Sequence, residues 1–364
     1  MRLSYYNGIR SEHLRRGFCG GQAQTHNRQW TVGHPGKDPG GLCLTHGHFV
    51  PADGAVPTPG DGQLVIRAVY LAPDPMNHAW VRGMPGKFDP LPQGSVMRGG
   101  VAGRVVASRH PHWKPGDGVA GFLDWADYSL SHGIDHMGMP LERVPADVSL
   151  ASGLSALGMT GLCAWLGLAA FGRPLPGDTV LVSGASGGIG SMAGQIAKLF
   201  GARAVGIAGG ADKCAAALRF GFDAAVDYKS PDLAGQIANE CPRGADVFFD
   251  NVGGPLLDAA LVNMADHGRI VICGAVAHYG AAPTPIFNHM QLALRSLTMQ
   301  GFFYFNLANR WPEGRARLAQ WLKDGSIRDT VDITEGFHSV PDVAIKQFAG
   351  GGTGRKLIRI AQET

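Results

Sequence analysis

Three things that this 364-residue sequence lacks narrow what it can be. No apolar run reaches the roughly 18 residues of a membrane-spanning helix; the longest candidate, Leu162–Phe171, is too short. The six cysteines lie far apart and form no C-x-x-C pair, which favours reduced thiols in a cytoplasmic protein over disulfides. The sequence also lacks a large excess of charge of one sign. The net charge is +3 and the basic residues are scattered, so the sequence indicates neither nucleic acid nor a membrane as partner.

The composition is that of a globular protein, with 45% hydrophobic and 17% charged residues. A chain of this length exceeds the usual size of one domain, so we expect two domains, each with its own core. Residues 1–26 are basic, with Glu12 as their only acidic residue, and contain no apolar stretch of the secretory kind. We therefore expect an extended N-terminal extension over residues 1–26.

The first patterned region alternates apolar and polar residues in short segments. Strands are predicted over Leu42–Phe49, Gln63–Tyr70, Val96–Ala107 and Val119–Leu130, with a Pro/Gly-rich connection over residues 51–62. Short strands with dense turns indicate a barrel-like β domain over roughly residues 27–150.

From Ser152 the apolar residues recur at helical spacing, and one long apolar helix is predicted up to Leu168. Strand and helix patterns then alternate through Cys273, and a sixth strand is predicted over Leu297–Phe303. This alternation is typical of a doubly wound parallel sheet in an α/β domain. After Asn309, helical and strand patterns mix again, and we expect this part to pack on the first domain.

A glycine turn lies at the start of the predicted parallel sheet. Val180–Val182 has the apolar character of a buried strand, and a helical pattern starts after Gly190. The turn between them carries Gly184, Gly187, Gly188, Ile189 and Gly190. Glycine lets the backbone approach a pyrophosphate, and a helix N-terminus offers free N–H groups and a partial positive charge. The stretch predicts dinucleotide binding.

The next strand favours NADP over NAD. An NAD site usually carries Asp or Glu where that strand ends, to bind the ribose hydroxyls. Here the strand ends in Ala208-Gly209-Gly210, and Lys213 follows. A cation without a carboxylate suits the 2′-phosphate of NADP, and Tyr228 can bind the same group. Lys213 can equally be a solvated lysine of the first helical turn.

Several runs together resemble one family. The most specific are Gly221-Phe222-Asp223-Ala224-Ala225 and Asp250-Asn251-Val252-Gly253-Gly254, and further matches run from about residue 27 to the C-terminus. On these residues the chain resembles the zinc-independent medium-chain dehydrogenase/reductases. The resemblance is to the branch of prostaglandin reductases (leukotriene hydroxydehydrogenases), alkenal double-bond reductases and curcumin reductases.

The resemblance implies a Rossmann domain inserted in a GroES-like β-barrel catalytic domain, usually as a homodimer. The catalytic domain would take residues 27–152 and 313–364, and the Rossmann NADP-binding domain 153–312. The activity implied is NADPH-dependent reduction of the carbon–carbon double bond of enones and enals. By similarity, Lys213 and Tyr228 hold the 2′-phosphate, and the glycine turn holds the pyrophosphate. By the same similarity, the nicotinamide half of the cofactor is lined by Asn251, Cys273, Ala275, Tyr279 and Phe302.

Enone reduction needs hydride delivery to the β-carbon and hydrogen-bond donors for the enolate oxygen. Tyr279 fits the donor role, and Asn77 is a second candidate, since Met76 stands where many relatives carry a tyrosine. Near the C-terminus, Thr353 stands where relatives often have asparagine. The predicted substrate pocket comprises Met76, Asn77, Trp80, Trp125, Tyr128 and Phe303, although each of the aromatic residues can equally be part of the core.

Other oxidoreductase classes fit less well. Metal is not expected, because Gly99-Gly100 stands where zinc-dependent relatives carry ligands. No tyrosine has a lysine four residues later, which excludes the Tyr-x-x-x-Lys chemistry of short-chain dehydrogenases. Two alternatives stay open: an NADPH quinone oxidoreductase, and a cofactor-binding protein without turnover.

Overall fold

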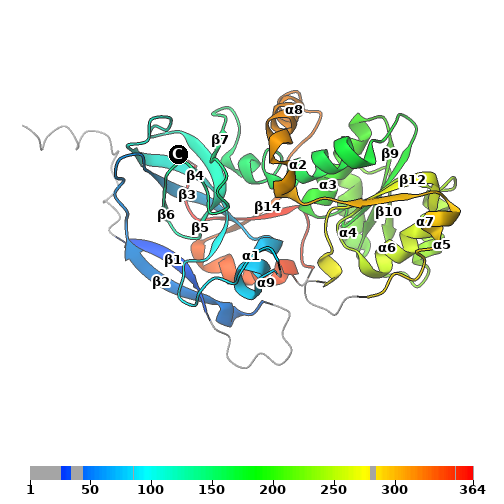
Figure 1. Ribbon diagram of the computed structural model, residues 1–364, viewed down its shortest axis with the longest axis horizontal. Helices are drawn as coiled ribbons and strands as arrows, with labels where there is room; N and C mark the ends of the chain where they lie inside the picture. Colours follow the sequence, from blue (N-terminus) through cyan, green and yellow to red (C-terminus); the bar gives the residue numbers. More distant parts are fainter. Residues whose placement is uncertain (1–25, 34–43, 85, 279–283, 349, 364) are drawn as a thin grey trace, which may run out of the picture.

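A computed structural model describes residues 26–33, 44–84, 86–278, 284–348 and 350–363. Figure 1 shows two sheet-based halves side by side along the long axis, with helix α2 (Met159–Leu166) and strand β14 (Val331–Glu335) between them. The predicted extension over residues 1–26 lies almost wholly outside the described residues. No helix in the described part of the chain is both long and apolar enough to span a membrane.

One half is built on a six-stranded parallel sheet. Its order is β10-β9-β8-β11-β12-β13, so the strands nearest the centre are the first and fourth of the sheet in sequence. The bounds are β8 Thr179–Ser183, β9 Arg203–Ala208, β10 Ala224–Asp227, β11 Ala245–Asp250, β12 Met264–Ile272 and β13 Thr298–Gly301. The order reverses between β8 and β11, and in such sheets ligands bind outside the carboxyl ends of the strands at this point. The predicted doubly wound sheet is confirmed.

Helices connect these strands and pack on the sheet. They are α3 Gly188–Leu199, α4 Ala211–Arg219, α5 Leu233–Glu240 and α6 Gly254–Leu261. α3 is the most buried: Gly190 through Ala197 are all inaccessible, because α3 lies under α2 as well as on the sheet. This burial fixes the position of the glycine turn at its N-terminus.

The other half contains a seven-stranded sheet that takes strands from both ends of the chain. The path runs β14-β15-β3-β4-β5-β7, and β6 pairs with β3. The bounds are β3 Leu64–Ala72, β4 Arg98–Ser108, β5 Gly118–Asp124, β6 Tyr128–Ser131, β7 Glu142–Val144 and β15 Arg355–Arg359. A separate pair joins β1 (His26–Val32) and β2 (Phe49–Ala55). The C-terminal segment, with β14 and β15, therefore packs on the domain formed by the N-terminal part of the chain, as expected. The exact domain boundaries stay predictions.

Three local predictions were wrong. The strand expected over Leu42–Phe49 starts only at Phe49 and runs into the Pro/Gly-rich connection, as β2. Val119–Leu130 is divided into β5 and β6. The long apolar helix is interrupted: the 3-10 turn Leu150–Leu154 precedes α2, and a π-helical turn, Gly167–Gly172, ends it. One further helix has no counterpart among the predicted elements: α1 (Pro75–Arg82) carries Met76 and Asn77 and is capped by Asp74.

The remaining elements are short or lie at the surface. They are the 3-10 turns His46–His48, Val276–His278, Tyr304–Arg310 and Phe337–Ser339, and the helices α7 Gln291–Leu294, α8 Trp311–Lys323 and α9 Val340–Phe348. The turn Tyr304–Arg310 and α8 lie in the middle of the molecule and contribute the aromatic side chains discussed below.

Candidate active site

The glycine turn closes tightly enough that glycine is required in it. Gly184 has φ +62°, and the Gly187 N–H donates to the Gly184 carbonyl at 2.9 Å. A Cβ on Gly190 would lie 2.2 Å from the same carbonyl oxygen. In the described part of the chain, the backbone N–H groups of Gly188, Ile189 and Gly190 have no partner. Free N–H groups at a helix N-terminus form an anion site, so the turn has a geometry that suits a pyrophosphate.

The C-terminal segment lies directly on this turn. The Gly354 N–H donates to the Ser186 carbonyl at 2.7 Å, and Gly187 pairs with Gly354 as an isolated parallel bridge. A Cβ on Gly188 would lie 3.3 Å from the Arg355 Cα. Thr353, which departs from the family pattern, is next to this contact. The cradle is therefore made from two parts of the chain that are far apart in sequence.

Three lysines gather at the end of β9. The Lys213 ammonium donates to the Gly350 carbonyl, and Lys356 forms an ion pair with Asp332 beside Gly352. Burial, followed by the charges of Lys229 and Lys356, lowers the pKa of Lys213. The Tyr228 ring packs on Gly209, where a Cβ would lie 2.6 Å from it. Cations brought together without an equal number of carboxylates suit a phosphate.

Asp227 ends the neighbouring strand β10 and bonds to the backbone around it. Its carboxylate accepts the backbone N–H groups of Gly210 at 2.8 Å and Lys229 at 2.9 Å. These bonds lower the pKa of Asp227 and leave the carboxylate holding the loop after β9.

The carboxyl ends of β11 and β12 bring together three predicted cofactor residues. Asn251 donates to the Ser183 carbonyl at 2.8 Å, and its side-chain oxygen is buried without a partner. Cys273 donates its N–H to the Asp250 carbonyl at 2.8 Å, and Ala275 lies beside Gly253. A hydrogen bond with the Cys163 thiol and burial raise the pKa of Cys273. Phe302 lies near the same edge, stacked on Phe171 at 5.4 Å.

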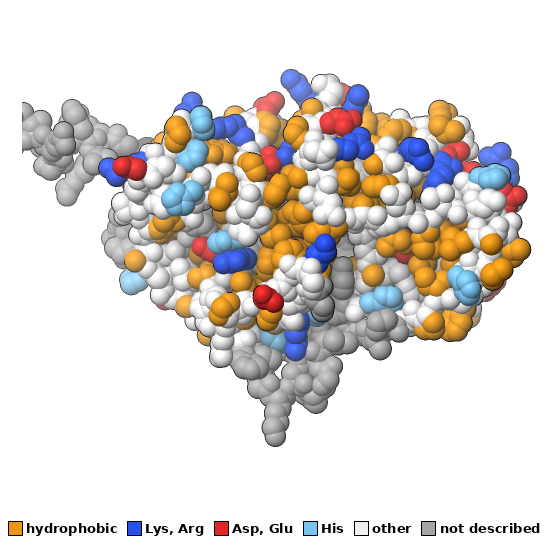
Figure 2. Space-filling view, in the orientation of Figure 1, with side chains coloured by type: hydrophobic (Ala, Val, Ile, Leu, Met, Phe, Trp, Pro, Cys, Tyr) orange, Lys and Arg blue, Asp and Glu red, His pale blue; other side chains and the backbone are white. Residues whose placement is uncertain are grey.

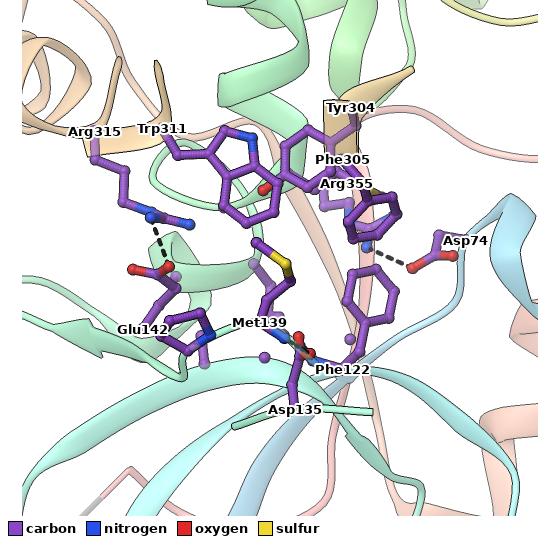
Figure 3. A pocket seen from close by; sticks show the side chains of 18 residues that line it. Asp74, Phe122, Asp135, Met139, Glu142, Tyr304, Phe305, Trp311, Arg315 and Arg355 are labelled. Carbon is purple, nitrogen blue, oxygen red and sulfur yellow. Dashed lines mark hydrogen bonds and ion pairs between the residues drawn. The ribbon is translucent and has the colours of Figure 1, made fainter. Parts of the chain in front are cut away.

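A hollow lies between the two halves and is lined by residues from both. In Figure 2, hydrophobic side chains gather in the middle of the molecule, below α8, where the hollow lies. Figure 3 shows aromatic side chains and a methionine around it, with an ion pair on each of two opposite sides. Its labelled apolar residues are Phe122, Met139, Tyr304, Phe305 and Trp311, and its labelled charged residues are Asp74, Asp135, Glu142, Arg315 and Arg355. Apolar walls with polar groups that converge on the space between them are typical of small-molecule sites.

The ion pair at one side is deeply buried. Arg355 approaches Asp74 at 3.5 Å and donates to the Pro73 carbonyl at 2.9 Å. Burial raises the pKa of Asp74 and lowers that of Arg355, although each charge stabilises the other. At the opposite side Arg315 pairs with Glu142 at 2.6 Å, and burial raises the pKa of Glu142.

The predicted substrate pocket is not brought together here. None of Met76, Asn77, Trp80, Trp125, Tyr128 and Phe303 lines this hollow. Trp125 is fully buried and stacks on Phe49, and Trp80 packs on Phe88, so both are core residues. Met76 is buried in α1, Tyr128 lies on β6 against Asn27, and Phe303 packs between Phe88 and Phe305.

Asn77 needs a specific correction. Its side chain is 0% exposed, accepts the Asp74 N–H at 2.9 Å and donates to the Arg98 carbonyl at 2.8 Å. The amide therefore completes a capping box at the start of α1, and the predicted role as a donor to substrate does not fit this placement. Tyr279, the other predicted catalytic residue, lies outside the described residues.

The sequence reasoning missed the residues that line the hollow, Tyr304, Trp311 and Arg355 among them. The available signals were the aromatic run Phe302–Phe305, of which only the first two residues fall in the predicted strand, and the single arginine after the glycines at 350–354. Neither signal indicates which side chains meet, because the elements that carry them are distant in sequence.

Comparisons with known proteins agree with this geometry. Residues 37–139 match the family described as the N-terminal domain of oxidoreductase, and residues 188–320 match the zinc-binding dehydrogenase family. The chain is 36% identical to the NADPH-dependent curcumin reductase of Escherichia coli (strain K12), over 94% of this chain and 99% of that protein. It is 32% identical to the 2-alkenal reductase (NADP(+)-dependent) of Nicotiana tabacum, over 84% and 89%.

A solved structure is similar as well. The crystal structure of CurA from Vibrio vulnificus in complex with NADPH matches with a TM-score of 0.82 at 32% identity, covering 92% of this chain and 99% of that one. In the described part of this chain, no three His, Cys, Asp or Glu side chains are grouped so that they could hold a metal ion. The chain belongs to the medium-chain dehydrogenase/reductase superfamily, in the branch that contains the curcumin, alkenal and prostaglandin reductases.

Proposed function

We propose that this protein reduces the carbon–carbon double bond of α,β-unsaturated ketones and aldehydes with NADPH. The observation that carries the proposal is the position of the apolar hollow. It adjoins the glycine turn through Arg355, whose backbone lies on Gly188 and whose side chain lines the hollow. A nucleotide on the turn and an apolar substrate in the hollow would therefore be neighbours.

The residues present fit an NADP cofactor. Gly187, Gly188, Ile189 and Gly190 would hold the pyrophosphate, and Lys213 with Tyr228 the 2′-phosphate. Asn251, Cys273, Ala275 and Phe302, together with Tyr279, would border the nicotinamide. The unpartnered, buried oxygen of Asn251 supports this assignment, because such an atom in a native site normally has a ligand or water as its partner. When bound, NADPH supplies a hydride.

The chain supplies the remaining requirements of the reaction. The hydride forms a bond to the β-carbon, the electrons of the double bond move toward the carbonyl oxygen, and the α-carbon takes a proton from a phenol or water. The aromatic walls would hold an apolar, flat substrate body and exclude water. A hydrogen-bond donor is needed at the carbonyl oxygen, and Tyr279 is the donor proposed from the sequence.

The test is stopped-flow oxidation of NADPH with a panel of enones, enals and quinones, combined with product analysis by mass spectrometry. Consumption of NADPH with formation of the saturated ketone supports the proposal. Turnover of quinones alone would identify the quinone oxidoreductase alternative. Quenching of NADPH fluorescence without consumption of NADPH would identify a binding protein without turnover.

We also propose a cytoplasmic homodimer. Cys163, Cys214, Cys241 and Cys273 are free thiols, which suits a reducing compartment. β13 ends the parallel sheet, and in the segment that precedes it in the chain Phe287 (72% exposed), Met290 and Leu294 present apolar side chains to solvent. Figure 2 shows hydrophobic side chains at this end of the molecule. A sheet edge beside an apolar patch is suited to pairing with a second copy.

A further inference from the structure

A second hollow adjoins the one described above. Apart from Arg143, the residues that line it alone are apolar: Val144, Pro145, Leu157, Ala316 and Ala319. They come from β7 and its end, from the segment before α2 and from α8. Four further residues line both hollows, namely Ala120, Glu142, Gly153 and Arg315. The two hollows therefore have a common boundary.

An ion pair forms most of this boundary. Ala120 contributes only a methyl group, and Gly153 packs so closely that a Cβ there would lie 2.6 Å from the Val144 side chain. Glu142 and Arg315 are the two long side chains among the four shared residues, and Arg315 Nη1 lies 2.6 Å from Glu142 Oε1. Figure 3 shows the two side chains meeting at one side of the first hollow.

The ion pair is held from both halves of the molecule. Glu142 belongs to β7 and Arg315 to α8, and the Arg315 guanidinium also lies over the Trp311 ring, 5.5 Å from its centroid. Both side chains are largely buried, with 21% of Arg315 and 32% of Glu142 exposed. An apolar chain that moved between them would leave two charges unpaired and partly desolvated, which is strongly unfavourable. The pair therefore closes the first hollow to an apolar ligand.

The glycine turn lies at the opposite side of the first hollow. Arg355 lines the hollow there, and its backbone packs on Gly188 of the turn. Figure 3 shows the Asp74–Arg355 pair and the Glu142–Arg315 pair on opposite sides. With a nucleotide on the turn, the reacting carbons of an enone would lie toward Arg355. The rest of the substrate would then extend toward the Glu142–Arg315 pair.

We propose that the Glu142–Arg315 ion pair is the end wall of the substrate hollow and sets the length of the enone that the protein accepts. The inference rests on the proposed function. Glu142 and Arg315 are specificity-determining residues in this scheme and take no part in hydride or proton transfer. Without their side chains the two hollows would be continuous, and a long alkyl tail would reach the apolar residues of the second hollow, such as Leu157 and Ala319.

The test measures kcat/KM for trans-3-alken-2-ones with alkyl tails of increasing length, in wild type and in the double variant Glu142→Ala/Arg315→Ala. Removing both partners leaves no unpaired charge. In wild type, kcat/KM should fall once the tail is too long for the first hollow. Each methylene that enters the second hollow is worth roughly fourfold in binding. The double variant should therefore raise the ratio of kcat/KM between long and short ketones about tenfold or more.

Further variants connect this gain to the second hollow. Ala319→Leu, added to the double variant, fills part of the second hollow and should remove the gain. Arg143→Ala is the matched control, because Arg143 lines the second hollow but pairs with Asp117, and it should keep the wild-type length profile. If the melting temperature shows that the double variant does not fold, Arg315→Ala alone should shift the profile in the same direction, since water reaches Glu142.

A binding measurement tests the wall without turnover. With NADP⁺ present, the affinity for saturated 2-alkanones should stop rising with chain length in wild type and continue to rise in the double variant. Identical length profiles in wild type and the folded double variant, or an equal shift in Arg143→Ala, would overturn the inference and leave the proposed function intact. If wild type reduces no enone but the binding profiles differ as expected, the proposed function fails and the wall remains.

Discussion

The backbone N–H of Gly354 donates to the carbonyl oxygen of Ser186 at 2.7 Å. This bond joins the segment before β15 to the glycine turn before α3. The glycine turn is therefore in contact with the half of the molecule that contains β15. Arg355, the residue after Gly354, both packs on Gly188 of the turn and lines the hollow.

Gly354→Ala should weaken both folding and NADPH binding. Gly354 has φ +67°, and a Cβ there would lie 2.3 Å from the Thr330 carbonyl oxygen. Gly177→Ala is the control, since Gly177 has φ +90° but open space around it. The control should lose about 1–2 kcal/mol from its φ alone. Gly354→Ala should lose more in urea unfolding and raise the Kd for NADPH at least tenfold. Equal stability of the two variants would contradict this packing.

Lys213→Ala should change the choice between coenzymes. The ammonium lies among Lys229 and Lys356, and the loss of one charged hydrogen bond to the 2′-phosphate should cost about 1–3 kcal/mol of NADPH binding. NADH lacks this phosphate, so its affinity should be unaffected. Lys323→Ala, on the exposed end of α8, is the control. Fluorescence titrations with both coenzymes measure the difference, and an equal loss for NADPH and NADH would exclude the phosphate role.

Cys241 should make stability fall at high pH. Burial raises the pKa of its thiol to about 11, so the folded state keeps a proton that the unfolded chain releases near pH 9. This stabilising contribution is complete below pH 9 and is lost as the pH rises through 11. In urea unfolding, Cys241→Ala should lose less stability than wild type between pH 8 and pH 11. Parallel pH curves for the two proteins would refute the assignment.

Leu294→Glu should convert a dimer into monomers. Leu294 ends α7, the helix just before the edge strand β13, and is exposed like Phe287 and Met290 of the same segment. A carboxylate buried without a partner in an interface is strongly unfavourable. Leu130→Glu is the control, since Leu130 is also an exposed leucine but lies on β6 in the other half. Size-exclusion chromatography with light scattering reports the mass. A dimeric Leu294→Glu protein would place the interface elsewhere.

The sequence predicted the parallel sheet well because its information is local. Each buried strand, such as Val180–Val182, is an apolar run followed by a helical pattern. The turn between strand and helix requires glycine because a Cβ there would clash with the backbone, as at Gly190. The same locality explains the errors in the other half. β2 forms across Pro51 and Gly54 because β1 pairs with it, and such pairing overrides local preference.

The candidate site was predictable only where it is local. Gly184–Gly190 and Lys213 follow from one strand–turn–helix unit and the next strand. Asn77 was predicted as a donor to substrate, but Arg98, which accepts its amide N–H, is 21 residues away and becomes a neighbour only when α1 lies on β4. Tyr304 and Arg355 line one hollow from elements whose proximity depends on how the two halves pack.

The buried pair Asp74–Arg355 limits how this part of the molecule can vary. Replacing either residue alone would strand one charge away from water, which typically costs about 3–5 kcal/mol. A large fraction of the stability of an ordinary domain, about 5–15 kcal/mol, would be lost in a single step. The two positions are therefore expected to change together or not at all. Asp74 at the start of α1 and Arg355 beside the glycine turn would then be inherited as a pair.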